Sequence, residues 1–353
     1  MNGRGVFPIV VIIAAGLHLA AANARADSCP PLQIVASTPM SYDQTGRPFI
    51  PVTLGTQQKY MLVDTGGALS MIGQSFVDQL GLPHYKVPIR QVDVGGESSD
   101  EAADVSPFAI GNLVARNMEL MVAPKSQSAE FTHGAAGAIG PTILRNYDAE
   151  FDFGANTFKL LSQDHCQGKV IYWPASGVAA IPMRVARIVG HIIVPVTLDG
   201  VTLNALIDTG ASNTFLSSLV AESDFGLKLD TPDVLDVGPL MGSPGARIYR
   251  HNFHTLSLDG ITITTPSVYI IPDLNGNKMG NGVQTGSRIS RADEAAGLED
   301  ITIGVDVLKH LHLYIAYKEQ MLYVTPIGST MSQPASLASP SGAGQAPASP
   351  APH

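Results

Sequence analysis

The stretches MLVDTGGALSMIG (Met61–Gly73) and ALIDTGASNTFLS (Ala205–Ser217) each carry Asp-Thr-Gly directly after three apolar residues. One such tripeptide arises by chance in roughly one chain of this length in fifteen. Two copies, each behind an apolar run, therefore need a common explanation. A continuous apolar run is typical of a buried strand, so each strand would deliver one aspartate, Asp64 or Asp208, into the protein interior.

The sequence around the two tripeptides is also repeated. PVTL occurs at Pro51–Leu54 and again at Pro195–Leu198, with nine residues between each copy and its tripeptide. Downstream, the segments that begin Ile-Gly at Ile139 and Ile303 align without a gap. We therefore predict two copies of one unit. Each would contain a hairpin leading to Asp-Thr-Gly, a short helix, a Gly-rich hairpin, a strand pair, the Ile-Gly segment with a second short helix, and a last hairpin.

The second copy is longer than the first. From Asp64 to Gly140 is 76 positions, whereas from Asp208 to Gly304 is 96. The segment Pro272–Asp300 is polar, rich in Gly and Asn, and without an apolar period. It is therefore predicted to be an inserted surface loop.

Composition indicates an ordinary globular protein that is mostly β. The chain has 353 residues, of which 45% are hydrophobic and 14% charged, with 35 Gly and 25 Pro. Alternating strand-like segments between Gly- and Pro-rich turns favour β structure. The net charge is −9 and no basic cluster occurs, which argues against nucleic acid as a partner.

The N-terminus has the pattern of a secretory signal peptide, predicted as residues 1–26. Arg4 is followed by an apolar stretch and by the small-x-small site ANARA. Its removal would take the net charge from −9 to −11, because Arg4 and Arg25 leave with it. The alternative is an uncleaved anchor, but the stretch is short for a span and contains Pro8 and His18. We expect no stable membrane anchor and an exported protein, periplasmic or secreted.

Two cysteines, Cys29 and Cys166, would remain in the mature chain. An even number in an exported protein favours one disulfide, which would join the start of the first domain to its end. Two unpaired thiols in a reducing compartment are the alternative.

Two aspartates brought together would form an acid–base pair. Like charges about 3 Å apart cannot both ionise, so the pair shares one proton. One carboxylate could then deprotonate a water while the protonated partner bonds to a scissile carbonyl. No cofactor or metal is needed for this chemistry. Metal sites are also poorly supported elsewhere: His251 and His254, and His310 and His312, are interpreted as surface histidines, and DLNGN (Asp273–Asn277) lacks the later ligands of a calcium loop.

The repeated motif resembles the aspartic peptidases of the pepsin and retropepsin superfamily. The resemblance spans roughly residues 45–327 and rests on apolar-apolar-Asp-Thr-Gly, a Gly-rich hairpin and a late apolar-Gly segment, each present twice. It implies two retropepsin-like β-barrel domains in tandem, in one exported chain of bacterial type, forming a mostly β, bilobal fold with pseudo-twofold symmetry. It further implies that Asp64 and Asp208 are the catalytic dyad of an aspartic endopeptidase. The residues expected to support the active-site turns are Thr65, Gly66, Thr209 and Gly210.

The chain departs from the family pattern after the first tripeptide, where Gly67 stands in place of Ala or Ser. With Gly67 and Ala211, a serine hydroxyl that would hold down a carboxyl pKa is missing. We therefore expect an activity optimum less acidic than that of pepsin. No clear equivalent of the pepsin flap tyrosine occurs. The candidate flap residues are Gly95, Gly96, Gly242 and Tyr249.

The expected organisation is a signal peptide (1–26), an N-terminal retropepsin-like domain (27–166), a linker (167–180), a C-terminal retropepsin-like domain (181–327) and a disordered Ala/Ser/Pro-rich tail (328–353). The expected partner is a polypeptide substrate, bound by a monomer whose two domains pair with each other. Two alternatives remain: a catalytically silent peptide-binding protein of the same fold, and a chain whose domains pair with those of a second copy.

Overall fold

The computed structural model describes residues 29–92, 97–124, 134–175, 177–187, 189–240, 245–272, 283–285 and 299–327. The predicted signal peptide and C-terminal tail lie outside these residues, as does most of the predicted inserted loop. Within the described residues, no helix is both long and apolar enough to cross a membrane.

The described residues of the first half form almost only strands, with two short helices. Its elements are β1 (Ile34–Pro39), β2 (Ser41–Tyr42), β3 (Pro48–Leu54), β4 (Gln57–Val63), β5 (Met71–Ile72), α1 (Gln74–Leu80), β6 (His84–Val92), β7 (Ser98–Val105), β8 (Phe108–Ile110), β9 (Leu113–Ala115), β10 (Met118–Val122), β11 (Ala135–Ile139), α3 (Pro141–Leu144), β12 (Asp148–Asp152) and β13 (Thr157–Leu161).

The second half repeats this order of elements. It contains β14 (Ala179–Pro182), β15 (Arg184–Val185), β16 (Ile192–Leu198), β17 (Val201–Ile207), β18 (Phe215–Ser217), α4 (Ser218–Ser223), β19 (Leu235–Pro239), β20 (Arg247–Asn252), β21 (Thr255–Leu258), β22 (Ile261–Thr264), β23 (Ser267–Ile271), β24 (Val283–Thr285), β25 (Ile301–Ile303), α5 (Val305–Leu308), β26 (Leu311–Ala316) and β27 (Met321–Pro326).

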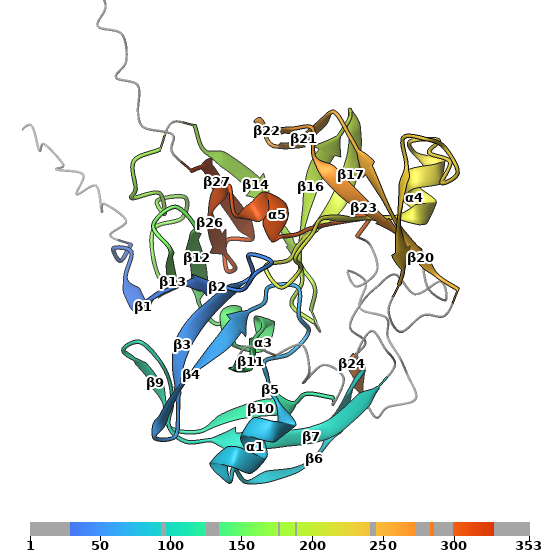
Figure 1. Ribbon diagram of the computed structural model, residues 1–353. Helices are drawn as coiled ribbons and strands as arrows, with labels where there is room; N and C mark the ends of the chain where they lie inside the picture. The colour runs from blue at the N-terminus through green and yellow to red at the C-terminus, as the bar shows by residue number, and fades with distance from the viewer. Residues whose placement is uncertain are drawn as a thin grey trace, which may run out of the picture.

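The strands form three sheets, and two of them follow the same plan. One runs β6-β7-β10-β5-β11-β4-β3-β8-β9, and the other runs β19-β20-β23-β18-β25-β17-β16-β21-β22, which is the same order of equivalent strands. We call the first sheet with α1 and α3 the N-terminal lobe, and the second with α4 and α5 the C-terminal lobe (Figure 1). The mostly β, bilobal aspartic-protease fold predicted from the sequence is confirmed.

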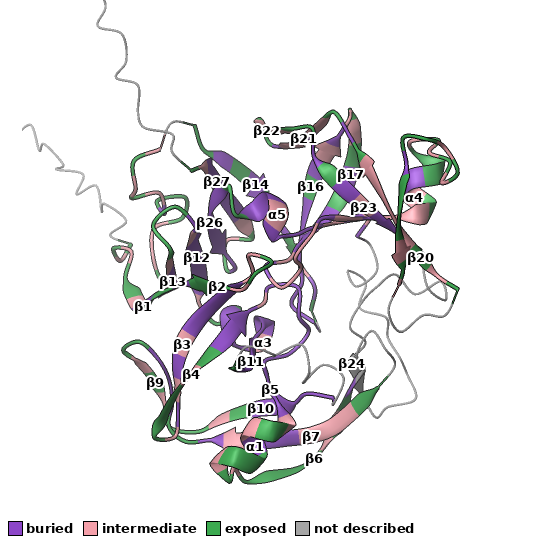
Figure 2. Ribbon diagram, in the orientation of Figure 1, coloured by how far each residue is buried: buried purple, intermediate pink, exposed green. Residues whose placement is uncertain are grey.

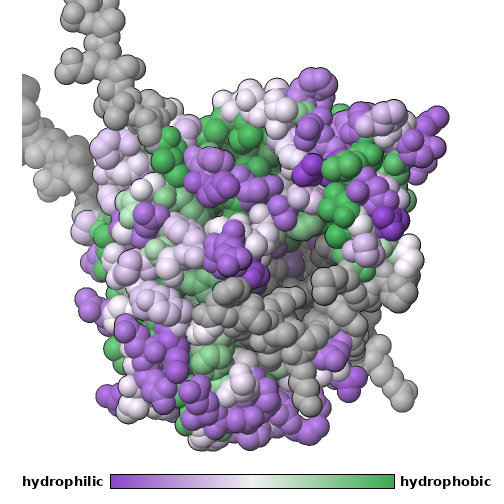
Figure 3. Space-filling model, viewed as in Figure 1, coloured by the Kyte–Doolittle hydropathy of each residue, from purple (hydrophilic) through white to green (hydrophobic). Residues whose placement is uncertain are grey.

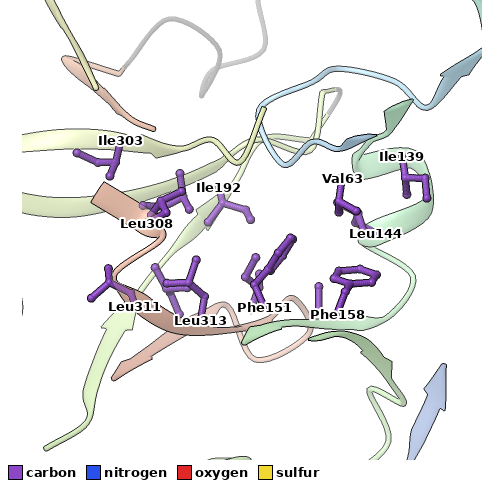
Figure 4. Packing of buried hydrophobic residues seen from close by; sticks show 14 of the residues in the cluster. Val63, Ile139, Leu144, Phe151, Phe158, Ile192, Ile303, Leu308, Leu311 and Leu313 are labelled. Carbon is purple, nitrogen blue, oxygen red and sulfur yellow. The ribbon is translucent and has the colours of Figure 1, made fainter. Parts of the chain in front are cut away.

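The third sheet, which we call the shared sheet, receives three strands from each half. Its order is β1-β13-β12-β26-β27-β14, and β12 and β26 pair antiparallel at its centre. Phe151 of β12 lies opposite Leu313 of β26. Figure 4 shows these two side chains in one apolar cluster, to which both halves of the chain contribute residues. Figure 2 shows the central strands of this sheet, β12, β26 and β27, as almost entirely buried. The core thus runs continuously through both lobes.

The shared sheet also buries a polar cluster. The imidazole Nε2 of His165 lies 2.7 Å from Asp148 Oδ2, and both side chains are at most 2% exposed. Asp148 additionally accepts hydrogen bonds from the Tyr314 hydroxyl (3.1 Å) and the Tyr317 amide (3.1 Å). Because Asp148 belongs to β12 and the two tyrosines to the second half, these bonds connect the two halves across the sheet.

The predicted linker crosses one face of this sheet. Trp173 stacks on His312 with a ring separation of 3.9 Å and donates a hydrogen bond to Thr325, and Tyr172 donates one to the buried Glu150. The interpretation of His312 as a surface histidine is therefore wrong. In β26 the side chain of His312 points toward Glu150 and Trp173, and it is only 8% exposed.

The predicted disulfide is confirmed: Cys29 and Cys166 are bonded, with a sequence separation of 137. The bond ties the first described residue of the chain to the segment that follows β13.

Two local predictions need adjustment. The strand pair expected after each Gly-rich hairpin is three strands, β8–β10 in one lobe and β21–β23 in the other. The inserted segment was expected to have no regular structure, yet β24 pairs antiparallel with β6 of the N-terminal lobe, with Val283 opposite Gln91. An edge strand such as β6 offers unpaired backbone groups, and β24 satisfies some of them.

Candidate active site

Each Asp-Thr-Gly turn follows a strand whose last three residues are buried. In β4, the exposed start gives way to three buried residues that end at Val63, because this end lies between β3 and β11. In the other lobe, β17 lies between β16 and β25 in the same way. Asp64 and Asp208 therefore emerge at equivalent points, both partly exposed at the junction of the lobes.

The two threonines connect the turns directly across that junction. The Thr65 hydroxyl donates to the Ile207 carbonyl (2.7 Å) and accepts from the Thr209 amide (3.0 Å). The Thr209 hydroxyl does the same with the Val63 carbonyl (2.6 Å) and the Thr65 amide (3.1 Å). Both threonines are fully buried. Each hydroxyl thus satisfies one acceptor and one donor of the opposite lobe, which fixes the distance between the turns.

The glycines of the tripeptides lie against the opposite carboxyl groups. An added Cβ at Gly66 would be 2.1 Å from Asp208 Cγ, and one at Gly210 would be 2.4 Å from Asp64 Oδ1. These distances leave no room for any side chain. Gly67, the departure from the family pattern, also lies close to a carboxyl group: an added Cβ there would be 2.7 Å from Asp64 Oδ2.

Backbone amides orient both carboxylates. Oδ1 of Asp64 accepts from the amides of Gly66 (3.0 Å) and Gly67 (2.7 Å). Oδ1 of Asp208 accepts from the amides of Gly210 (2.8 Å) and Ala211 (3.1 Å).

The two carboxyl groups also bond to each other and hold a proton more tightly than isolated aspartates. Burial, and then the charge of Asp208, raise the pKa of Asp64 to about 8, against the lowering effect of its two amide donors. Burial also raises the pKa of Asp208, but the amides of Gly210 and Ala211 and the hydrogen bond from Asp64 oppose it. The pair therefore shares one proton at pH values where an isolated aspartate is ionised.

A polar layer that the sequence analysis missed supports each turn from behind. In the N-terminal lobe, Ser70 Oγ bonds to the Gly140 amide (3.0 Å) and to Thr142 Oγ1 (2.8 Å). In the C-terminal lobe, Thr214 Oγ1 donates to Asp306 Oδ1 (2.8 Å). The signal was present in the repeat, because the ungapped alignment puts Thr142 opposite Asp306 within otherwise apolar segments.

The candidate flap residues are only partly placed. Gly95, Gly96 and Gly242 lie outside the described residues. The hairpins that they were expected to close are present as β6–β7 and β19–β20. Tyr249 lies in β20, opposite Asp236, and packs half-buried against the core.

The fold and the paired Asp-Thr-Gly turns define a protein of the aspartic-protease class. Residues 50–140 and 194–317 match the sequence profile of the aspartyl protease family, which is more than half of the chain, and the chain belongs to this family. No curated protein matches the sequence. Among solved structures, the fold is similar to the crystal structure of edgp, with 9% identity over 84% of this chain and 96% of that one, and a TM-score of 0.49.

Proposed function

We propose that this protein is an exported aspartic endopeptidase made of two retropepsin-like halves that arose by internal duplication. The observation that carries the proposal is the pair of half-buried aspartates, Asp64 and Asp208, each held by two amides and each in contact with the glycine of the opposite turn. The equivalent strand order of the two lobes supports the duplication.

In the proposed mechanism, Asp208 is the general base and Asp64 the general acid. Asp208 takes a proton from a water held between the carboxyl groups, and the resulting hydroxide attacks the carbonyl carbon of the scissile peptide bond. Asp64 gives its proton to the carbonyl oxygen as the tetrahedral intermediate forms. The proton on Asp208 then passes to the leaving nitrogen, and collapse of the intermediate returns a proton to Asp64.

The substrate is proposed to be a polypeptide in an extended conformation that crosses the dyad between the hairpins β6–β7 and β19–β20. Extended peptides are bound mainly through backbone hydrogen bonds to strand edges, with side-chain pockets adding specificity. Near α4 and β20, Figure 3 shows apolar residues at the surface, and the exposed apolar side chains of this region are Leu219, Leu235 and Val237. They favour substrates that carry apolar side chains.

Export and a monomeric state belong to the same proposal. The disulfide fits an oxidising compartment such as the periplasm or the medium. The interlobe threonine bonds and the shared sheet provide within one chain the pairing that a retropepsin obtains from two chains. Light scattering should therefore give the mass of one chain.

The test compares wild type, Asp64→Asn and Asp208→Asn, recovered after export, on an unfolded protein and a peptide library from pH 3 to 7.5. Mass spectrometry would identify the products. Asp78→Asn, which alters an exposed carboxylate of α1, is the matched control. Cleavage by wild type and the control alone is expected. Folded wild type that binds peptides without cleaving any would favour a silent peptide-binding protein, and equal cleavage by the dyad variants would overturn the proposal.

A further inference from the structure

Two equivalent turns each reach from one lobe to the other behind the dyad. The turn between β2 and β3 contains Gly46 (φ +91°), where an added Cβ would be 3.8 Å from Val305 Cγ2. The turn between β15 and β16 contains Gly190 (φ +75°), where an added Cβ would be 2.5 Å from Pro141 Cβ. Val305 and Pro141 are the first residues of α5 and α3. Each lobe therefore packs a turn against the helix that follows the Ile-Gly segment of the other.

The N-terminal turn also contacts the loop after Asp208, through a chain of polar groups. Ser212 Oγ donates to Thr45 Oγ1 (3.0 Å), and Thr45 Oγ1 donates to Asp43 Oδ1 (2.7 Å). A hydroxyl has one proton, so Thr45 can only accept from Ser212 while it donates to Asp43. Asp43 is fixed by Arg47, whose Nε lies 2.8 Å from Oδ2. Burial raises the pKa of Asp43, but the bonds from Thr45 and Arg47 lower it on balance, so the chain ends in a carboxylate.

The C-terminal turn makes its contact without hydroxyl groups. In the repeat, Val189 is equivalent to Thr45, and Ala68 is equivalent to Ser212, both at a spacing of 144 residues. Val189 and Ala68 belong to one buried apolar cluster. Besides the threonine bonds that both turns make, the loop after Asp208 is therefore attached to the opposite lobe by a further hydrogen bond, whereas apolar side chains occupy the equivalent place after Asp64. This is a departure from the pseudo-twofold symmetry next to the dyad.

Ser212 directly follows the loop that holds Asp208. The amides of Gly210 and Ala211 donate to Asp208 Oδ1, so a shift of Ser212 changes the alignment of these donors. We propose that Thr45 is a positioning residue for Asp208: by holding Ser212, it keeps the two amides aimed at the carboxylate and so stabilises the ionised form of Asp208. This inference rests on the proposed function of the site.

The test is the pH dependence of Thr45→Val, which removes the hydroxyl and keeps the shape. The titratable group facing Asp208 is Asp64, and the charge facing Asp43 is Arg47. Weaker amide bonds raise the pKa of the base, so the acid limb of the kcat/KM profile should move to higher pH. On that limb kcat should fall about three- to tenfold, the range for one neutral hydrogen bond, with KM little changed. Thr45→Ser should restore the profile.

The matched control is Ser41→Ala, which removes another hydroxyl of the same hairpin, one that bonds to the Phe49 carbonyl within its own lobe. Its profile should follow that of wild type. Carboxyl ¹³C titration of Asp-labelled protein gives a second reading that needs no turnover: the lower apparent pKa of the dyad should rise in Thr45→Val. Titration curves and rate profiles identical to those of wild type would overturn the inference. If the titration curves of wild type and Thr45→Val differ but wild type cleaves no peptide, only the proposed function would be refuted.

Discussion

Replacing Thr209 by valine isolates the energy of the connection between the lobes. The two side chains have nearly the same shape, so the change removes a hydroxyl without leaving a large cavity. The lost hydroxyl donates to the Val63 carbonyl (2.6 Å) and accepts from the Thr65 amide (3.1 Å). Thr209 is fully buried, so water cannot readily replace either bond.

The magnitude follows from the groups left behind. A buried donor or acceptor that loses its partner costs about 1–3 kcal/mol, and here one of each is affected. We therefore expect the free energy of unfolding to fall by about 2–6 kcal/mol, a large part of the ~5–15 kcal/mol typical of a folded protein. The same loss should separate the two turns and lower kcat, because the distance between the carboxyl groups is fixed by these bonds.

Urea denaturation followed by fluorescence and circular dichroism would measure the change. Thr202→Val, at an exposed position of β17, is the control and should stay within about 0.5 kcal/mol of wild type. A loss below about 1 kcal/mol in Thr209→Val would refute the reasoning, since it would mean that the carbonyl and amide find other partners at no cost.

Three further predictions concern the shared sheet, the disulfide and the dyad. Burial lowers the pKa of His165, but its bonds to Asp148 and the neighbouring carbonyl raise it on balance; a raised pKa stabilises the folded state at low pH, so the unfolding free energy should fall as pH rises above about 6.5. This slope should flatten in His165→Gln, and equal slopes in urea titrations would contradict the argument. Reduction of Cys29–Cys166, which are 137 residues apart, should cost up to about 5 kcal/mol through the entropy of the unfolded chain, and an unchanged denaturation midpoint in the double serine variant would exclude it. Gly66→Ala should abolish turnover, because its Cβ would lie 2.1 Å from the carboxyl carbon of the opposite aspartate; full activity in a peptide-cleavage assay would contradict that geometry.

The sequence was most informative where local chemistry and the repeat agreed. The apolar runs before Asp64 and Asp208 predicted buried strands that lead to the aspartates, and the last three residues of both strands are buried. The hairpin predicted before the second tripeptide turns at Asp199-Gly200, a dipeptide typical of such turns, and the positive φ of both residues (44° and 86°) fits the pairing of β16 with β17. These features depend on neighbours in the chain, so a single sequence contains them.

The features that the sequence did not predict depend on contacts between distant segments. The hydrogen bond between Ser212 and Thr45 joins residues 167 positions apart. The burial of His312 depends on Trp173 stacking on its ring, whereas the sequence analysis interpreted this histidine as lying at the surface. The pairing of β24 with β6 requires the insertion of one lobe to meet an edge strand of the other. No local sequence pattern specifies these contacts between distant segments.

The central pairing of the shared sheet has a consequence for how the chain folds. The first half ends at β13, and its strand β12 has no neighbour on one side until β26, more than 150 residues later, is available. During synthesis the N-terminal half therefore carries an open strand edge, which is a template for pairing with another chain. Since β12 and β26 are equivalent strands, the closest substitute for β26 is β12 of a second nascent molecule. A chain cut short after β13 should accordingly associate into two-chain assemblies, and completion of the second half is the step that prevents it.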